Sequence, residues 1–143
     1  MNCVFCGIVT GDVPAHVVWE SDEVMAFLDG RPVFSGHTLV VPRAHVVTLP
    51  LLPDELVVPL FSAARLVAAA MASDGFGAHG TFVGVNNTVS QSVAHLHVHV
   101  VPRHFKDGLR GFFWPRTKYG GEDEAASVAG RLRAAISTLI PEP

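Results

Sequence analysis

The chain lacks a long hydrophobic segment. Its longest uninterrupted apolar run, Leu66–Ala72, has seven residues, whereas a membrane-spanning helix needs about 20. The N-terminus also lacks a basic segment followed by an apolar one, and Asp12 and Pro14 interrupt it early. We therefore expect a soluble, cytoplasmic protein with no membrane partner.

A surplus of positive charge is also missing. The formal net charge is −3, from 10 Lys and Arg against 13 Asp and Glu, so we expect no nucleic-acid partner. Five of the ten basic residues nevertheless fall between Arg103 and Lys118, with only Asp107 opposing them. This cluster is either a solvated loop or an electropositive rim suited to an anionic small molecule.

Cysteine is scarce, since Cys3 and Cys6 are the only two. A C-x-x-C pair in a cytosolic protein more often binds a metal or takes part in redox chemistry than forms a structural disulfide. No strand–helix–strand pattern surrounds the pair, which counts against a thioredoxin-like role.

The chain does have enough apolar residues for a core. Of its 143 residues 49% are hydrophobic, and the mean hydropathy is +0.36. These values exclude a disordered chain and predict a single domain over residues 1–143.

The most informative stretch is 91–103, where three histidines alternate with aliphatic residues. A strand sends alternate side chains to opposite faces, so the imidazoles would share one face and the aliphatic side chains would pack on a core. A helix would scatter the histidines around its axis. We predict a strand over residues 94–102, with His95, His97 and His99 on one face and Leu96, Val98 and Val100 on the other.

Apolar spacing and turn residues predict the remaining elements. Pro59 lies early in the first long helix, so we expect that helix to kink there or to begin near it. Short antiparallel strands with two main helices indicate an α+β domain with a sheet of about five strands. The other expected strands are 16–20, 23–28, 37–43 and 80–85, and the helices are 53–73 and 123–140.

The histidine row allows three interpretations. It could belong to an open catalytic zinc site, it could attack a phosphate as a neutral imidazole, or its members could be ordinary surface residues, which strict alternation disfavours. Neutral hydrogen-bond donors precede the row, and no carboxylate that could activate a metal-bound water lies near it, which favours phosphate chemistry. Those donors are Asn86, Asn87, Gln91 and Ser92.

At this point the sequence resembles a known family. Residues 95–101 match the His-φ-His-φ-His-φ-φ signature (φ hydrophobic) of the histidine triad (HIT) family of nucleotide hydrolases and transferases. The likeness covers most of residues 3–103 in the family's order, which leaves 104–143 as a C-terminal extension and helix. It implies a HIT-like fold. The other similar segments are 3–9, 26–29, 36–45 and 91–93.

The resemblance implies a role for each residue of the triad region. His97 would attack the α-phosphate of a nucleoside phosphate and form a nucleotidyl-histidine that water then hydrolyses. His99 would hydrogen-bond a phosphate oxygen and, if protonated, offset its charge. Ser92 and Gln91 would contact the phosphate or the leaving group.

The resemblance also implies a nucleoside pocket. Asp29, at the end of the second expected strand, would accept the ribose hydroxyls, although it could also be a plain turn residue. The base would lie against Phe5, Ile8 and Phe27, each of which could instead serve only the core.

Family members with an N-terminal C-x-x-C pair resemble zinc proteins. Here the implied ligands are Cys3, Cys6, His45 and His95, a closed set that suits structural zinc. The alternative is that the thiols stay free and that His95 hydrogen-bonds within the site. No organic cofactor is expected.

Two segments depart from the family pattern. The loop 86–90 is shorter than usual and lacks the glycines that commonly precede the glutamine, so which of Asn86 and Asn87 contacts phosphate stays open. The segment 107–116 is aromatic and basic, and it would either cap the site and select the leaving group or clasp the core or a partner subunit.

We therefore expect a HIT hydrolase acting on a purine nucleoside phosphate conjugate, either a phosphoramidate or a dinucleoside polyphosphate. The rivals are a nucleotide-binding regulatory protein with little turnover and a metal-dependent hydrolase. Family members are typically homodimers, and the apolar helix 56–71 is a candidate interface.

Overall fold

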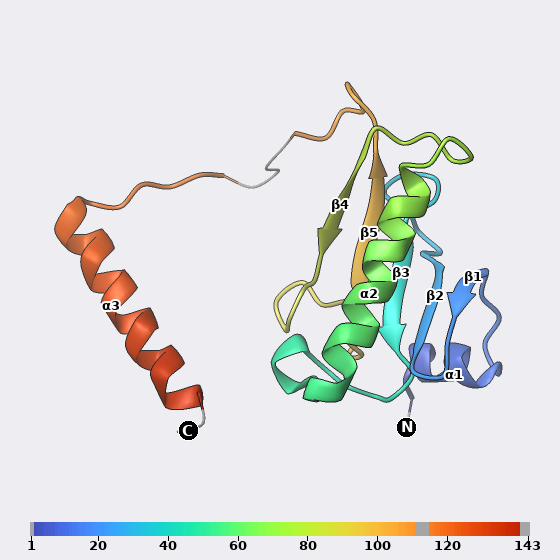
Figure 1. Ribbon diagram of the computed structural model, residues 1–143, viewed down its shortest axis with the longest axis horizontal. Helices are drawn as coiled ribbons and strands as arrows, with labels where there is room; N and C mark the ends of the chain where they lie inside the picture. The colour runs from blue at the N-terminus through green and yellow to red at the C-terminus, as the bar shows by residue number, and fades with distance from the viewer. Residues whose placement is uncertain (1, 111–114, 141–143) are drawn as a thin grey trace. The chain divides into compact units, whose positions relative to one another are not determined.

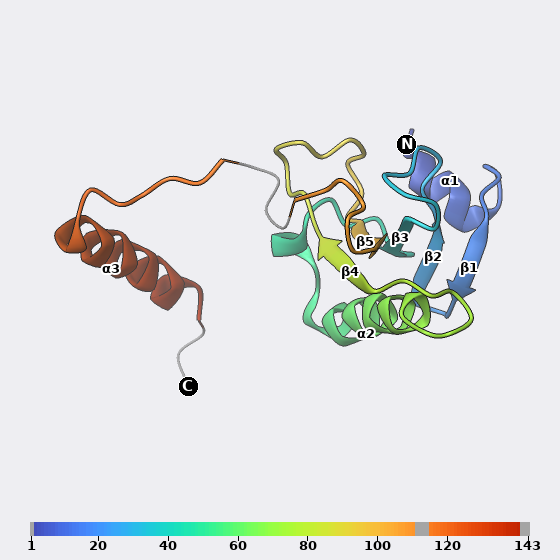
Figure 2. The same ribbon diagram turned by 90° about the horizontal axis from the view of Figure 1, so that it is seen from above.

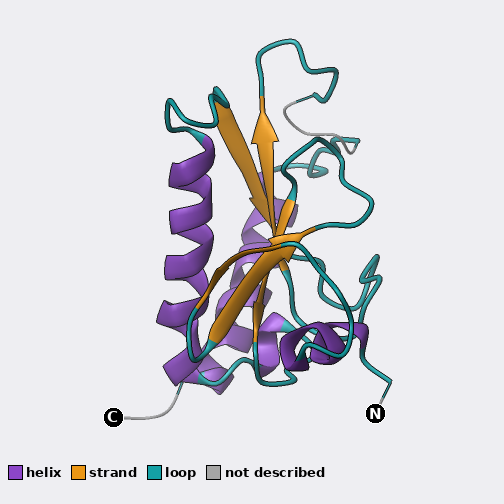
Figure 3. Cartoon of the chain, turned by 90° about the vertical axis from the view of Figure 1, so that its right-hand side faces the viewer, coloured by secondary structure: helices purple, strands orange, loops and turns teal. Residues whose placement is uncertain are grey.

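The computed structural model of the chain describes residues 2–110 and 115–140. Within these residues, five strands form one antiparallel sheet in the order β1-β2-β3-β5-β4 (Figure 1). The sheet twists along its length, as sheets of L-residues do (Figure 3). The strands are β1 (Val17–Glu20), β2 (Val24–Leu28), β3 (Thr38–Pro42), β4 (Gly80–Gly84) and β5 (Val98–Arg103).

The middle strands of the sheet are covered on both faces, with α2 (Asp54–Met71) on one side and α1 (Val4–Thr10) on the other (Figure 2). Alternate residues of β2 therefore enter different cores. Val24 and Ala26 pack in the cluster that contains α2, whereas Met25 and Phe27 pack in the cluster that contains Phe5 of α1. Burial of both faces explains why these strands are continuous apolar runs in the sequence.

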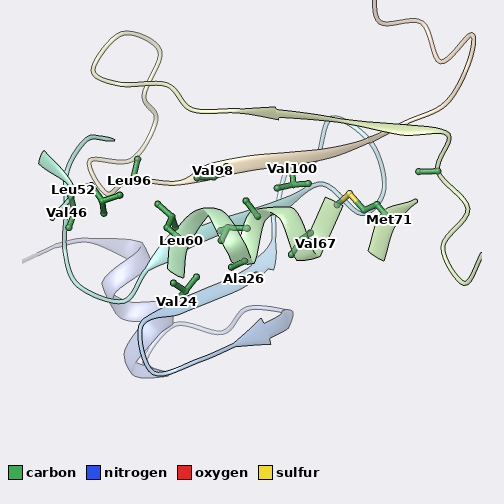
Figure 4. Packing of buried hydrophobic residues seen from close by; sticks show 14 residues of the cluster. Val24, Ala26, Val46, Leu52, Leu60, Val67, Met71, Leu96, Val98 and Val100 are labelled. Carbon is green, nitrogen blue, oxygen red and sulfur yellow. The ribbon is translucent and has the colours of Figure 1, made fainter. Parts of the chain in front are cut away.

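The larger core lies between α2 and the sheet (Figure 4). Its α2 residues recur at helical spacing, so one stripe of the helix meets the strands. The aliphatic residues that alternate with the histidines enter this core as expected. The buried α2 residues are Leu60, Ala63, Ala64, Val67 and Met71, and their partners include Leu96, Val98 and Val100.

Helix α1 is short and held at both ends. At its start the Cys3 sulfur accepts a hydrogen bond from the Cys6 N–H. At its end Gly11 adopts a left-handed conformation (φ 86°) that a residue with a Cβ rarely adopts, and its N–H bonds the Ile8 carbonyl. The helix and its N-cap residue thus bring Cys3, Phe5 and Cys6 close together.

The α+β class and the five antiparallel strands are confirmed, whereas several predicted bounds were wrong. The histidine strand begins at Val98, not at residue 94. Helix α2 begins at Asp54, one residue after the predicted start, and continues through Pro59, which cannot donate the helical hydrogen bond to the Glu55 carbonyl. Helix α1 and a 3-10 turn, Leu49–Leu51, were not predicted.

The chain divides into two compact units, Met1–Asp107 and Gly108–Pro143. The second contains α3 (Glu122–Leu139), close to the expected helix 123–140, while Pro141, the expected stop, lies outside the described residues. Among the described helices, none combines the length and the apolar character that crossing a bilayer requires.

Candidate active site and metal centre

The three histidines of the row lie on the α1 side of the sheet. The ring of Phe5 lies 5.9 Å from that of His95 and 5.1 Å from that of His97. The rings of His97 and His99 are 4.9 Å apart. The predicted alternation therefore holds from residue 95, although regular strand pairing starts only at Val98.

His97 is presented to a cavity with a defined tautomer. The residue is 3% exposed and lines a cavity of about 370 Å³, a size within the usual range of small-molecule pockets. The Nδ1 atom lies 2.7 Å from the backbone oxygen of His95. Because a carbonyl oxygen only accepts, Nδ1 carries the hydrogen in the neutral ring and Nε2 keeps the lone pair.

His99 has the opposite arrangement, set by His37. The Val33 N–H donates to Nδ1 of His37 at 3.0 Å, so the neutral His37 ring carries its hydrogen on Nε2. That Nε2–H donates to Nδ1 of His99 at 2.9 Å. His99 therefore carries its own hydrogen on Nε2, the atom left to donate to a ligand.

Both of these rings are neutral near pH 7. Burial, with the charges of His97 and His37, lowers the pKa of His99 to about 4. Burial is also the main cause that lowers the pKa of His37, and the Asp29 carboxylate, 3.6 Å away, opposes it. These residues form a chain of neutral hydrogen-bond donors.

Asp29, His37 and His99 lie close enough together to suggest a metal site. The tautomer of His37 argues against it, since its Nε2 carries a hydrogen and cannot be a ligand while Nδ1 accepts from Val33. Sequence reasoning missed His37, although it lies within the segment 36–45 that resembles the family.

The cavity gathers most of the residues expected to bind a nucleoside phosphate. Leu39, which pairs with His99 across β3 and β5, adds to its apolar wall and was not predicted. Asp29 lies at the cavity, and one of its oxygens accepts from the Arg31 N–H at 2.8 Å. The predicted residues that line it are Phe5, Ile8, Phe27, Asp29, Ser92, His97 and His99.

Asn86, Asn87 and Gln91 are not among the residues that line this cavity. The side-chain oxygen of Asn87 accepts from the Leu49 N–H at 2.7 Å. Gln91 uses both ends of its amide, accepting from the Thr88 N–H at 2.8 Å and donating to the Val47 carbonyl at 2.6 Å. Their contact with substrate stays a prediction.

The four expected zinc ligands form one cluster. Their sulfur and nitrogen atoms all lie within 4.8 Å of one another. The Nδ1 atom of His95 is 3.4 Å from the Cys3 sulfur and 3.6 Å from the Cys6 sulfur, and Nδ1 of His45 is 3.3 Å from the Cys6 sulfur. A tetrahedral zinc ion holds sulfur at about 2.3 Å and nitrogen at about 2.0–2.1 Å, which separates such atoms by about 3.6 Å.

His95 is oriented to offer Nδ1 to this cluster. Its Nε2 lies 2.8 Å from the Pro42 carbonyl and donates to it, which leaves the lone pair on Nδ1. Burial lowers the pKa of His95, so the ring is neutral as a ligand must be. Burial raises the pKa of the Cys6 thiol, an effect that a divalent cation would reverse. The donors present fit zinc.

The basic cluster after the histidines is only partly described. Arg103 is paired with Asp107 through bonds of 2.6 and 3.0 Å, so its charge is already balanced. Residues 111–114, the aromatic part of the segment expected to cap the site or clasp the core, lie outside the described residues.

Comparisons with known proteins agree with this geometry. A sequence profile of the HIT domain matches residues 10–106. The Bacillus subtilis protein called Protein hit is 38% identical over 138 residues, which cover 92% of this chain and 94% of that protein. The Arabidopsis thaliana adenylylsulfatase HINT3 is 31% identical over 109 residues, 76% of this chain and 55% of that protein.

Solved structures are similar over nearly the whole chain. A HIT family member from Bacillus subtilis has a TM-score of 0.84 at 32% identity, covering 100% of both chains. A zinc-bound histidine triad family protein from Mycobacterium smegmatis has a TM-score of 0.73 at 35% identity, covering 94% of this chain and 98% of that one. The HIT-like fold is confirmed, and the chain belongs to the HIT, or histidine triad, family.

Proposed function

We propose that this protein hydrolyses the α-phosphate linkage of purine nucleoside phosphate conjugates through a nucleotidyl-histidine on His97. One observation carries the proposal: the neutral His97 ring keeps its lone pair on Nε2 and lines a cavity with the dimensions of a ligand pocket. A nucleophile must present a free lone pair to the phosphorus atom.

The reaction has two steps that balance. In the first, a bond forms between Nε2 of His97 and the α-phosphorus while the bond to the leaving group breaks. The leaving group departs with its electron pair and takes a proton from solvent water. In the second, water attacks the same phosphorus and gives up a proton to solvent, the N–P electron pair returns to Nε2, and the nucleoside monophosphate leaves as the neutral His97 imidazole is regenerated.

His99 and Ser92 stabilise the phosphoryl oxygens as neutral donors in this scheme. The Nε2–H of His99 is the hydrogen left for a ligand, since Nδ1 is bonded to His37. The pKa of about 4 makes His99 uncharged in the free protein. His99 therefore binds the phosphate as an uncharged hydrogen-bond donor.

The nucleoside part of the substrate is supported by the lining of the cavity. Phe5 and Phe27 meet edge to face at 5.3 Å and offer flat apolar surface to a base. Asp29 offers carboxylate oxygens to the ribose hydroxyls. The name adenylylsulfatase given to one relative supports adenylyl compounds as the substrate class.

A nucleotide-binding regulatory protein with little turnover is the second candidate. The burial of His97, whose ring contacts both Phe5 and His99, favours it, because a closely packed ring has little room to follow a moving phosphorus. The two candidates differ in whether His97 is needed for product release.

We propose further that the four-residue cluster binds one structural zinc ion. Bound there, zinc supplies a rigid cross-link and no reactive position, because all four positions are taken by protein atoms. Cys3 and Cys6 tie α1, which carries Phe5 and Ile8, to the row at His95. His45 would join the segment that follows β3 to the same zinc ion.

We also propose that the chain works as a homodimer through the outer face of α2. This face keeps four large apolar side chains exposed, between 36% and 71%. An apolar surface of this kind on a helix is typical of an interface. The residues are Val57, Val58, Phe61 and Leu66.

His97→Ala should abolish turnover of an adenylylated amine, because the substitution removes the nucleophile. We expect AMP release, followed by chromatography, to fall by at least about 10³-fold. His79→Ala, a histidine substitution outside the cavity, is the matched control and should leave the rate unchanged. Slow AMP release that the His97 substitution does not change would refute the proposal and favour the regulatory protein.

The purified protein should contain one zinc per chain by elemental analysis, and Cys6→Ser should lose it. Removing zinc should increase amide hydrogen exchange in α1 far more than in α2, because α1 has little other support. His104→Ala should retain the metal. If a chelator stops turnover while α1 stays protected, the metal acts in catalysis and its structural role is wrong.

Sedimentation equilibrium should give a mass twice that of the 15.3 kDa chain. Val58→Asp places a charge in the proposed interface, and it should shift the protein to monomer because a buried unpaired carboxylate is costly. Val33→Asp, at another exposed valine, is the control. A wild-type monomer, or a Val58→Asp dimer, would count against this interface.

A further inference from the structure

Gln91 was expected to contact phosphate, but the structure gives its side chain a different set of partners. Its amide oxygen accepts from the Thr88 N–H at 2.8 Å, and its amide nitrogen donates to the Val47 carbonyl at 2.6 Å. This orientation is unambiguous, because a flipped amide would set donor against donor and acceptor against acceptor. Gln91 therefore connects two backbone segments.

The loop that Gln91 holds has an unfavourable backbone conformation. Thr88 has φ 68° and Ser90 has φ 61°, both in the left-handed region. Residues with a Cβ seldom adopt it, and for a β-branched residue such as Thr88 it is an outlier. Surrounding contacts must hold such a loop in place.

The contacts that hold the loop come from the segment just after the zinc ligand His45. Val47 receives the Gln91 amide, and the Leu49 N–H donates to the side-chain oxygen of Asn87 at 2.7 Å. The backbone of Val46 also accepts from the Leu96 N–H at 2.7 Å. Segment 46–49 thus lies beside the loop and is hydrogen-bonded to Asn87 near its start and to Gln91 near its end.

The end of the braced loop lies at the cavity. Ser92 directly follows Gln91 and lines the cavity together with His97 and His99. The position of the Ser92 hydroxyl relative to His97 therefore depends on where Gln91 fixes the chain. A displacement of about 1 Å at a reacting group is enough to slow a reaction strongly.

We propose that Gln91 is a positioning residue, whose side chain braces the strained 87–92 loop against Val47 and so holds Ser92 beside His97. Asn87 anchors the other end of the same loop. The inference rests on the proposed hydrolase function. It replaces direct phosphate contact by Gln91, whose side chain is bonded to Thr88 and Val47 and does not line the cavity.

A rescue experiment separates bracing from direct contact. Gln91→Ala removes the brace, and turnover of the adenylylated amine should fall about 10-fold or more in kcat, because Ser92 loses its position. Ser90→Gly removes the cost of the left-handed conformation, so the loop holds its shape with less help. The double variant should recover to within about threefold of wild type.

Control variants decide between positioning of the loop and direct contact of Gln91 with substrate. Val89→Ala, at an 80% exposed side chain in the same loop, should behave as wild type, and all variants should remain folded at the assay temperature. A double variant as slow as Gln91→Ala would mean that the amide contacts substrate, which overturns the proposal. A Gln91→Ala enzyme with normal kcat would also overturn it.

The affinity for AMP, measured by calorimetry on the wild type and the same variants, separates this inference from the proposed function. If the wild type binds AMP but releases none from the adenylylated amine, the hydrolase proposal fails. The brace is then tested by whether Ser90→Gly restores the AMP affinity that Gln91→Ala weakens. If Gln91→Ala changes neither the AMP affinity nor the turnover rate, the positioning role of Gln91 is wrong, whether or not the protein is a hydrolase.

Discussion

The hydrogen bond from Nδ1 of His97 to the backbone oxygen of His95 is the contact on which the site depends. A carbonyl oxygen can only accept, so this bond leaves the lone pair of the neutral ring on Nε2. The donor and the acceptor are two residues apart, just before β5 begins, so the backbone that aligns the histidines also sets the tautomer of the middle one. Any chemistry at His97 begins from this constraint.

The same principle assigns the neighbouring histidines. His95 donates through Nε2 to Pro42 and so turns Nδ1 to the cysteines. His99 accepts through Nδ1 from His37 and so keeps a hydrogen on Nε2. The three imidazole rings are chemically identical, yet His95 offers a metal ligand, His97 a free lone pair and His99 a hydrogen-bond donor. What differs between them is the partner of the second ring nitrogen.

The sequence was most informative where periodicity decides the outcome. Alternation correctly placed the histidines and Leu96 on opposite sides, and this arrangement extends to His95 although the pleated strand begins only at Val98. Helix α1 was missed because its start is capped by a thiol, a weak acceptor outside the usual capping residues. His37 was missed because its role depends on Val33 and His99, contacts that no local pattern encodes.

The partners of Gln91 were also beyond sequence reasoning. The family resemblance predicts that it contacts a phosphate or the leaving group, whereas its bond to Val47 depends on how segment 46–49 packs beside the loop. The left-handed Thr88 and Ser90 give no signal in composition, since glycine is the residue that normally marks such a position. Here tertiary contacts replace the local preference.

The most direct test of the account is the tautomer of His97 in the resting protein. Long-range ¹H–¹⁵N NMR of the imidazole rings distinguishes a protonated ring nitrogen from a bare one. We predict that the neutral His97 ring carries hydrogen on Nδ1 and a bare Nε2. A neutral ring with hydrogen on Nε2 would contradict the account, because no lone pair would then face the phosphorus.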